Sequence, residues 1–267
     1  MIVVTPPRKK RSSGGHWYST SGRPVHTQPS GKNTTLAHSR LQNLVPSVTT
    51  IIGQLDKPPL TKWRENNCIA NSFNNPPREG EDVKSYKNRI HQNLKDDQGE
   101  VLDFGTKIHK AIEDVNNGTF DSLKDPDLFP YIDPFIRWQR RRVKEVKAVE
   151  RTVVNVQYGY GGTLDLHCVL LNETRPVTII DYKTQNIKDK VKFYPEWSYQ
   201  LAAYRKCFQP VPRCMSLVIN SNEPAEVIEK VWTSEELQAG WRIFKGLCRI
   251  WQDKTNHRVT KETDGNE

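Results

Sequence analysis

Three segments with strand character follow one another between residues 154 and 183, and no other feature of the chain constrains its fold as strongly. Residues 154–158 alternate apolar and polar side chains, which is typical of a strand with one buried face. Residues 160–162 supply a turn or bulge, residues 164–170 form a second candidate strand, and residues 177–183 are apolar enough for a central strand. Because only short turns separate the three segments, the sequence predicts an antiparallel meander.

Helical patterns surround this meander. The clearest covers residues 100–116, where apolar side chains recur at spacings of three and four until Asn117-Gly118. Thr233 and Glu236 have the spacing of a capping box at the start of a last helix. In full, the patterns predict helices near residues 44–52, 60–73, 82–93, 100–116, 131–147, 197–208 and 233–251, and further strands at 215–219 and 227–231. This order predicts an α/β sandwich, with a mixed central sheet flanked by helices.

Composition divides the chain into four parts. Residues 1–40 are rich in Ser, Gly, Pro, Lys and Arg, and we expect them to form a flexible basic arm. Residues 41–100 form a helical region, residues 101–253 the α/β core, and residues 254–267 a polar tail. The basic run in the arm suits phosphate binding, a localisation signal or a simple solvated tail.

The charge of the chain favours a polyanionic partner. There are 40 Lys and Arg residues against 31 Asp and Glu residues, which gives a formal net charge of +9 and a pI of about 9.3. Nucleic acid is the first candidate for such a partner. Arg140 and Arg141 belong to a basic face of the helix predicted at 131–147. Many basic proteins bind no nucleic acid, so this interpretation needs a motif beside it.

The cysteines and the apolar runs bear on the compartment. Five cysteines, an odd number without a close pair, do not form the pattern of a secreted disulfide framework. No apolar run approaches the roughly 18 residues of a membrane span, and the first residues lack the apolar segment of a signal peptide. The sequence therefore predicts a soluble, intracellular protein that engages no membrane.

Two aspartates and a lysine carry the chemistry of the predicted meander. Asp165 lies within the second strand, Asp181 ends the apolar third strand, and Lys183 faces the same side as Asp181. Buried carboxylates are costly without a cation, so their convergence predicts a hard divalent metal, Mg²⁺ first, that polarises a phosphate and activates water. The plainer alternative is that Lys183 forms a structural ion pair with one of the aspartates.

The order of several motifs resembles a known family. The motifs are Gly105-x-x-x-His109, Gly162-x-x-Asp165, Asp181-Tyr182-Lys183 and Gln200-x-x-x-Tyr204. In this order and spacing they resemble the RecB-like branch of the PD-(D/E)XK nucleases, over roughly residues 100–210. The resemblance implies a restriction-endonuclease-like core with a mixed sheet flanked by helices.

A second stretch narrows the resemblance. Residues 45–51, followed by residues 60–63, are similar to the N-terminal region of the exonuclease subgroup that includes the mitochondrial genome maintenance exonuclease and phage-encoded relatives. This implies metal-dependent hydrolysis at DNA ends, single-stranded or in a duplex, in recombination, replication or repair. A single-strand-binding or recombination protein is an implied partner. No amphipathic Arg-rich presequence is evident, which favours a phage or bacterial protein of the cytoplasm over a mitochondrial one.

The resemblance also implies roles for individual residues. Asp165, Asp181, the Tyr182 carbonyl and His109 would hold one or two Mg²⁺ or Mn²⁺ ions, with Glu150 as an additional ligand. Lys183 would serve the nucleophilic water. Gln200 and Tyr204 would position DNA or the catalytic groups. Without the family, His109 is an ordinary half-buried histidine, Glu150 an ion-pair partner of nearby arginines, and Tyr204 a core residue.

Further candidate DNA contacts come from the N-terminal helices. Ser47 and Thr49 are expected to contact phosphates, although helix capping explains them equally well. Trp63 or Tyr160 is expected to stack on an unpaired base. Cys68 with three later cysteines mimics the order of an iron-sulfur ligand set, but the absence of Cys-x-x-Cys disfavours a cluster.

The alternatives keep the same fold. A structure-selective or nicking endonuclease would use the same groups on internal bonds. A DNA-binding or assembly protein without catalysis would retain the fold alone, although the intact acidic pair and lysine argue against it.

Overall fold

A five-stranded mixed sheet forms the centre of the molecule. The computed structural model describes residues 16–259, apart from the side chains of residues 59–60 and 97–102. The strands are β3 (Val143–Asn155), β4 (Tyr160–Leu170), β5 (Val177–Gln185), β6 (Arg213–Asn220) and β7 (Ile228–Val231), in the order β3-β4-β5-β6-β7. Only the β5–β6 pair among them is parallel. The predicted antiparallel meander is therefore confirmed, and α6 (Pro195–Arg205) provides the crossover that a parallel pair requires.

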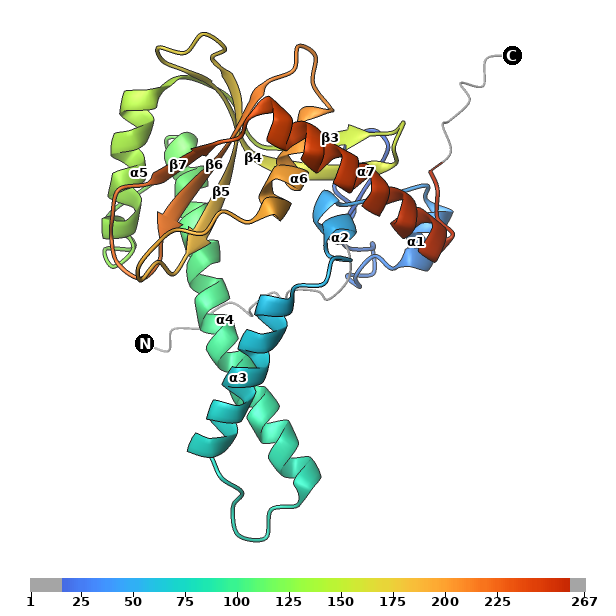
Figure 1. Cartoon of the computed structure of the whole chain (residues 1–267), viewed down its shortest axis with the longest axis vertical. Helices are drawn as coiled ribbons and strands as arrows, with labels where there is room; N and C mark the ends of the chain where they lie inside the picture. Colours follow the sequence, from blue (N-terminus) through green and yellow to red (C-terminus); the bar gives the residue numbers. More distant parts are fainter. Residues whose placement is uncertain (1–15, 260–267) are drawn as a thin grey trace.

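Helices cover both faces of this sheet (Figure 1), as the predicted sandwich requires. On one face α4 (Val83–Asn116) and α5 (Phe129–Arg142) pack through residues such as Ile108 and Phe135. On the other face α6, α7 (Ser234–Thr255) and the short α2 (Val48–Ile52) share a second apolar cluster. The capping box predicted for the last helix is present, because Thr233 and Glu236 cap each other.

The N-terminal region is more ordered than the sequence predicts. β1 (Trp17–Tyr18) pairs with β2 (Val45–Pro46), and α1 (Leu36–Leu41) lies between them in the chain. Trp17 is buried against Trp251 of α7. The flexible arm predicted for residues 1–40 is therefore wrong from residue 16 onward, since burial of two large aromatic side chains offsets the entropy of ordering this segment. The basic run at residues 8–11 and the end of the polar tail lie outside the described residues.

Two helices project from the sheet as a hairpin (Figure 1): α3 (Pro58–Asn74) and the first half of α4. α4 is continuous over 34 residues, where the sequence patterns predicted separate helices at 82–93 and 100–116. The sequence between them contains no proline, and a single glycine at position 99 costs only about 1 kcal/mol in a helix. The predicted boundary at residue 100 consequently falls inside one helix. Val101 belongs to the apolar face predicted for residues 100–116, and its side chain lies outside the described residues.

Two other helix boundaries differ from prediction. α3 begins at Pro58, two residues before the start of the helix predicted at 60–73, and prolines suit the first turn of a helix. α5 ends at Arg142 and β3 begins at Val143, although the predicted helix reached residue 147. Residues 143–149 contain three valines, whose branched side chains fit a pleated strand paired with β4.

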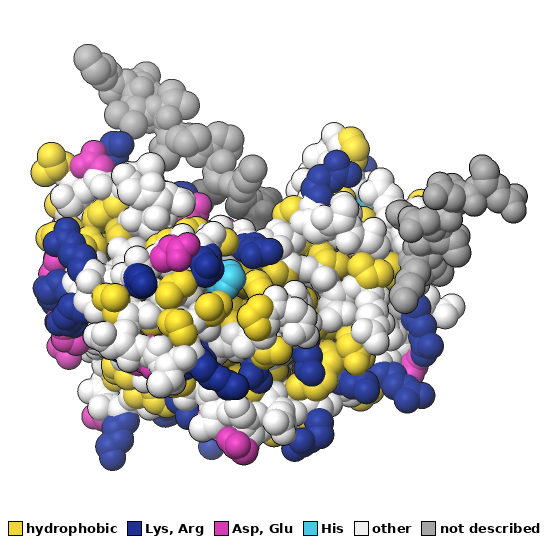
Figure 2. Space-filling view, turned by 90° about the horizontal axis from the view of Figure 1, so that it is seen from above, with side chains coloured by type: hydrophobic (Ala, Val, Ile, Leu, Met, Phe, Trp, Pro, Cys, Tyr) yellow, Lys and Arg dark blue, Asp and Glu magenta, His cyan; other side chains and the backbone are white. Residues whose placement is uncertain are grey.

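Lys and Arg side chains do not gather in one place on the face of the molecule that Figure 2 draws. Much of the predicted basic face of α5 is paired, because Arg141 contacts Glu226 and Arg142 contacts Glu173 and Glu229. Net charge therefore does not by itself locate a binding site. Within residues 16–259, none of the helices has the length and apolar character needed to cross a membrane.

Candidate active site

Asp165 and Asp181 face each other where two strands separate. The last pair between β4 and β5 is Leu166 with Ile180, and one position further the same register would pair Asp165 with Asp181. Instead of a ladder bond, the backbone N–H of Tyr182 donates to Asp165 Oδ2 at 2.6 Å. The carboxylate thus takes the place of a strand carbonyl, and the two acids meet at the fork between the strands.

The electrostatics of this pair favour a cation. Asp181 is only 3% exposed, and its Oδ2 accepts no well-aligned hydrogen bond among the described residues, although it forms an ion pair with Lys183. Burial and the charge of Asp181 raise the pKa of Asp165 well above its ordinary value, and the charge of Lys183 and the Tyr182 N–H offset this only partly. Two carboxylates of this kind are costly to leave ionised without a compensating positive charge.

Lys183 provides one positive charge. Its Nζ lies 2.7 Å from Asp181 Oδ2 and donates to Gln200 Oε1 at 3.1 Å. The same ammonium lies 5.9 Å from the centre of the Trp197 ring, within the range of a cation–π contact. Asp181 and Lys183 therefore share one side of β5, as strand alternation predicted. Gln200 and Trp197 of α6 contact the lysine on that side.

Tyr204 completes this chain of contacts. Gln200 Nε2 donates to the Tyr204 hydroxyl at 3.3 Å, one helical turn along α6. The Tyr204 ring lies against the backbone of Gly162, where a Cβ atom would stand 2.6 Å from ring atom Cε1. Only glycine at position 162 lets the Tyr204 ring pack this closely on β4. This contact gives a physical reason why the Gly162 and Tyr204 motifs occur together.

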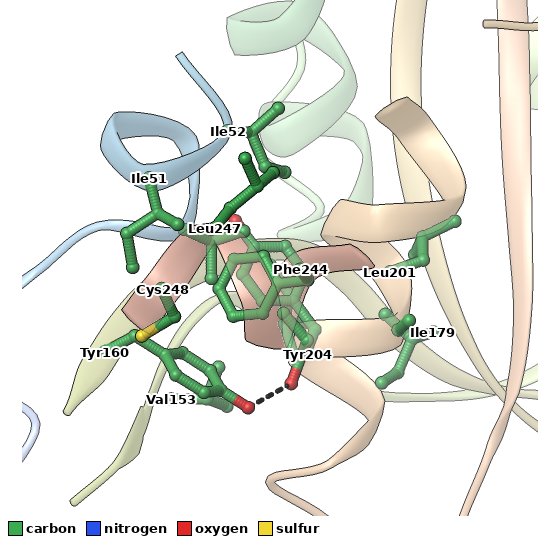
Figure 3. Packing of buried hydrophobic residues seen from close by; sticks show 14 of the residues in the cluster. Ile51, Ile52, Val153, Tyr160, Ile179, Leu201, Tyr204, Phe244, Leu247 and Cys248 are labelled. Atoms are coloured by element: carbon green, nitrogen blue, oxygen red, sulfur yellow. Dashed lines mark hydrogen bonds between the residues drawn. The ribbon is translucent and has the colours of Figure 1, made fainter. Parts of the chain in front are cut away.

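Tyr204 is also part of the apolar cluster behind the site. Figure 3 shows its ring among Tyr160, Phe244 and Leu201. Tyr160 is fully buried and its hydroxyl donates to the Ala203 carbonyl at 2.9 Å. The expectation that Tyr160 stacks on an unpaired base is therefore wrong, because no face of its ring reaches solvent.

A third acidic residue, Glu150, lies on β3, the strand next to Asp165. The register of β3 and β4 places it opposite Asp165, between the pairs Val149–Leu166 and Arg151–Leu164. Its backbone is left-handed, with φ of 47°, which is strained for a side chain of this kind. Glu150 has solvent-exposed surface, but desolvation by the surrounding protein and the charge of Glu113 raise the pKa of its carboxyl group. The predicted additional acid is therefore adjacent to the pair, on an irregular stretch of strand.

His109 is placed differently. It lies on α4, and its ring is 6.1 Å from the ring of Tyr182, which packs on the α4–α5 side of the sheet. Within the described part of the chain, no three His, Cys, Asp or Glu side chains are arranged to hold an ion together. The donors that converge are hence two carboxylates. This set still suits Mg²⁺, which commonly uses one or two carboxylates and completes its shell with water and substrate oxygens.

A cleft of about 640 Å³ adjoins Lys183 and Gln200. Residues of α2 and of the start of α3 line one part of it, and residues of β5, of the segment before α6 and of α6 itself line the rest. Its lining consists of Thr49, Ile52, Gly53, Asp56, Lys57, Pro58, Trp63, Lys183, Lys192, Tyr194, Glu196, Trp197 and Gln200. The volume is in the range of pockets that enclose a ligand of nucleotide size.

The predicted DNA contacts divide between this cleft and other places. Thr49 and Trp63 line it. Ser47 is buried and its hydroxyl accepts from the Thr50 N–H as the N-cap of α2, so the capping interpretation accounts for it. Arg140 and Arg141 lie at the end of α5, where they do not line the cleft.

Sequence reasoning missed part of the cleft. Tyr194, Trp197, Lys57 and Lys192 were not singled out, although all four line it. The signal was the density of aromatic residues around the start of α6, in Phe193, Tyr194 and Trp197. The cysteines are free thiols, and Cys207, Cys214 and Cys248 contact the apolar cluster behind the site.

The fold and the site define a mixed α/β protein with a carboxylate pair, an adjoining lysine and a cleft. No family model matches the chain, and no curated protein matches it. Among solved structures, one match is a protein from Eubacterium rectale described provisionally as an exonuclease. It shares 12% identity at a TM-score of 0.38, over 61% of this chain and 80% of that one. A likeness this distant does not place the chain in a family.

Proposed function

We propose that the chain is a metal-dependent DNA exonuclease with a PD-(D/E)XK core. One observation carries this proposal: Asp165, Asp181 and Lys183 converge at the fork of β4 and β5, beside a cleft of about 640 Å³. Carboxylate pairs with an adjoining lysine suit phosphodiester hydrolysis, because the acids hold a hard cation and the lysine offsets charge on the phosphate.

Asp165 and Asp181 would hold the ion, together with the carbonyl of Tyr182, the residue after Asp181 on β5. Glu150, whose position in the strand register is opposite Asp165, would join them directly or through water. His109 would have to turn from its contact with Tyr182 to do so. When bound, Mg²⁺ or Mn²⁺ polarises the scissile phosphate and lowers the pKa of a coordinated water.

The chain's own groups orient the reactants. Lys183 forms an ion pair with Asp181 and donates a hydrogen bond to Gln200, and its side chain belongs to the lining of the cleft. There it would orient the attacking water and stabilise the negative charge that develops on the phosphate. Gln200 is fixed in turn by Tyr204, so the amide presents its oxygen to the lysine.

Action at DNA ends, in recombination, replication or repair, is the part of the proposal that depends on the motif resemblance. A structure-selective endonuclease would use the same groups. A covalently closed circular DNA separates the two, because only an endonuclease cuts it.

The test is cleavage of end-labelled single- and double-stranded DNA by the wild type, Asp181→Ala and Lys183→Ala, with Mg²⁺, Mn²⁺ or EDTA. We expect activity only in the wild type with metal. Metal-dependent cleavage that survives in both variants contradicts the assignment. DNA binding in EDTA without cleavage in any divalent metal favours a non-catalytic DNA-binding protein instead.

A further inference from the structure

The last helix, α7, carries an exposed apolar strip in addition to its buried face. Its buried face packs into the core through residues such as Phe244 and Trp251. Ile243 and Ile250, two turns apart, are nevertheless 41% and 51% exposed. Residues 239, 243, 246 and 250 are Ala, Ile, Gly and Ile, at spacings of four and three, so they lie along one side of the helix. Apolar positions at these spacings are typical of a face that packs against a second helix.

Gly246 leaves the middle of this strip open. A Cβ atom at position 246 would have none of the surrounding side chains or loops within 4 Å. Packing inside the chain therefore does not require a glycine here, and glycine is less favourable than alanine within a helix. The missing side chain does allow the backbone of another helix to approach α7 closely.

The charges beside the strip have one sign. Between residues 237 and 252, α7 contains Arg242, Lys245 and Arg249 and no Asp or Glu. All three basic side chains are exposed. The next acid along the helix, Asp253, lies 4.0 Å from Arg249. A partner that combines apolar side chains with carboxylates would complement this side of α7.

We propose that the outer side of α7 is a docking surface for an acidic amphipathic helix of another protein. The apolar side chains of that helix would cover Ile243 and Ile250, and its carboxylates would pair with Arg242, Lys245 and Arg249. A helix supplies apolar side chains at the same spacings of three and four, so the two faces can interdigitate. None of these residues lines the cleft beside Lys183, so the proposal does not depend on the nuclease reaction.

Three other occupants fit this surface less well. A second copy of the chain would bring its own Arg242, Lys245 and Arg249 against the same three residues, and like charges at an interface are unfavourable. Nucleic acid would neutralise the basic side chains, but Ile243 and Ile250 offer its bases no ring for stacking. A helix that lies on a membrane buries a broad apolar face with aromatic residues, whereas the broad apolar face of α7 is already in the core.

The experiment measures binding of the full chain to three labelled helical peptides of about five turns by fluorescence anisotropy. The first peptide has Leu at spacings of three and four, flanked by Glu. The second replaces Glu with Lys, and the third replaces Leu with Ser. We expect the first peptide to bind at least about tenfold more tightly than either of the others.

Substitutions on the apolar strip test its contribution. Ile243→Ser and Ile250→Ser should each weaken binding of the acidic peptide by about tenfold, because each removes apolar surface from the contact. Gly246→Leu should weaken binding by a similar factor, since its side chain would occupy the space that the peptide needs. The matched control is Ile69→Ser on α3, where the isoleucine is 69% exposed, and it should bind as the wild type does.

A charge exchange tests the basic residues. A chain with both Arg242→Glu and Arg249→Glu should lose the acidic peptide and bind the Lys peptide instead. This gain of binding separates an effect on charge pairing from a loss of folding.

Four results would overturn the proposal: no binding of the acidic peptide, an equal loss in Ile69→Ser, self-association of the wild type that Ile243→Ser abolishes, or binding of oligo(dT) or phosphatidylserine vesicles that Ile243→Ser weakens as much as peptide binding. The last two would assign the strip to a second copy, to nucleic acid or to lipid. DNA cleavage by Ile243→Ser should equal that of the wild type, so the docking surface and the proposed nuclease can fail independently.

Discussion

Gly162 of β4 lies beneath the ring of Tyr204, so closely that a methyl group at position 162 would be 2.6 Å from ring atom Cε1 and 3.0 Å from the hydroxyl oxygen. Gly162→Ala should therefore displace Tyr204, release Gln200 and leave Lys183 without its amide partner. We expect the cleavage rate to fall about 10- to 100-fold, as for lost supporting contacts around a metal site. The free energy of unfolding should fall by about 1–3 kcal/mol from overpacking.

The control for this change is Gly105→Ala in α4. A Cβ atom there would meet Thr184 at 3.8 Å, an ordinary contact, and alanine favours a helix more than glycine. Its stability should rise by up to about 1 kcal/mol, with activity unchanged. Equal activity of the two variants would show that Tyr204 does not position the site.

Removing one charge from the carboxylate pair should raise the free energy of unfolding and abolish cleavage. Asp165→Asn removes a charge that burial and Asp181 disfavour, while its side-chain oxygen can still accept from the Tyr182 N–H. In EDTA the variant should be more stable than the wild type by about 1–3 kcal/mol, and it should lose metal-dependent cleavage. Urea unfolding with and without Mn²⁺ measures both effects, since only the wild type should gain stability from the ion.

Asp253→Asn is the comparison for that experiment, because Asp253 pairs with Arg258 at the exposed end of α7. Its stability should change by no more than about 0.5 kcal/mol. A wild type as stable in EDTA as Asp165→Asn would mean that the pair carries no unfavourable charge.

The sequence was sufficient for the local part of the site. Strand alternation predicted that Asp181 and Lys183 share a side, and the 2.7 Å contact between them confirms it. Alternation did not predict which faces of the sheet the side chains of β4 occupy. Leu164 and Leu166 should share one face, yet they belong to apolar clusters on opposite faces of the sheet. The neighbouring strand β3 is irregular at Glu150, opposite Asp165 in the register, and such a conformation leaves no period in a sequence.

Long-range packing was also beyond the sequence. The cleft joins residues 49–63 to residues 183–200, and no pattern within either segment shows that they meet. Trp17 and its neighbours have no sustained period, and their order comes from contacts with α7 at the other end of the chain. His109 was assigned through its motif, but the structure places its ring against Tyr182.

Glu150 gives a third prediction, because its left-handed backbone costs about 1–2 kcal/mol. Glu150→Gly removes this strain but adds freedom to the unfolded chain, so its free energy of unfolding should be about 0–1 kcal/mol higher than that of the wild type. If the carboxylate supports the site, cleavage should nevertheless slow about 10- to 100-fold. Unfolding in urea and single-turnover cleavage measure the two effects.

Asn172→Gly is the matched variant for Glu150→Gly, since Asn172 has a φ of 57° in the turn between β4 and β5. It should leave cleavage unchanged. Unaltered cleavage by Glu150→Gly would restrict Glu150 to a structural role.

His26 predicts how stability depends on pH. Its ring stacks on His16 at 4.6 Å and its Nδ1 accepts the Trp17 N–H at 3.1 Å. Burial and the neighbouring His16 lower the pKa of His26 below its ordinary value of 6.5. Below that pH the unfolded chain binds a proton that the folded chain does not, so the free energy of unfolding should decrease as pH falls through 6.5.

His26→Gln should flatten this dependence of stability on pH. His91→Gln, at an exposed histidine of α4, should leave it as in the wild type. Urea unfolding on either side of pH 6.5 measures the difference. A dependence that is equally steep in His26→Gln would show that another group loosens the Trp17 strand in acid.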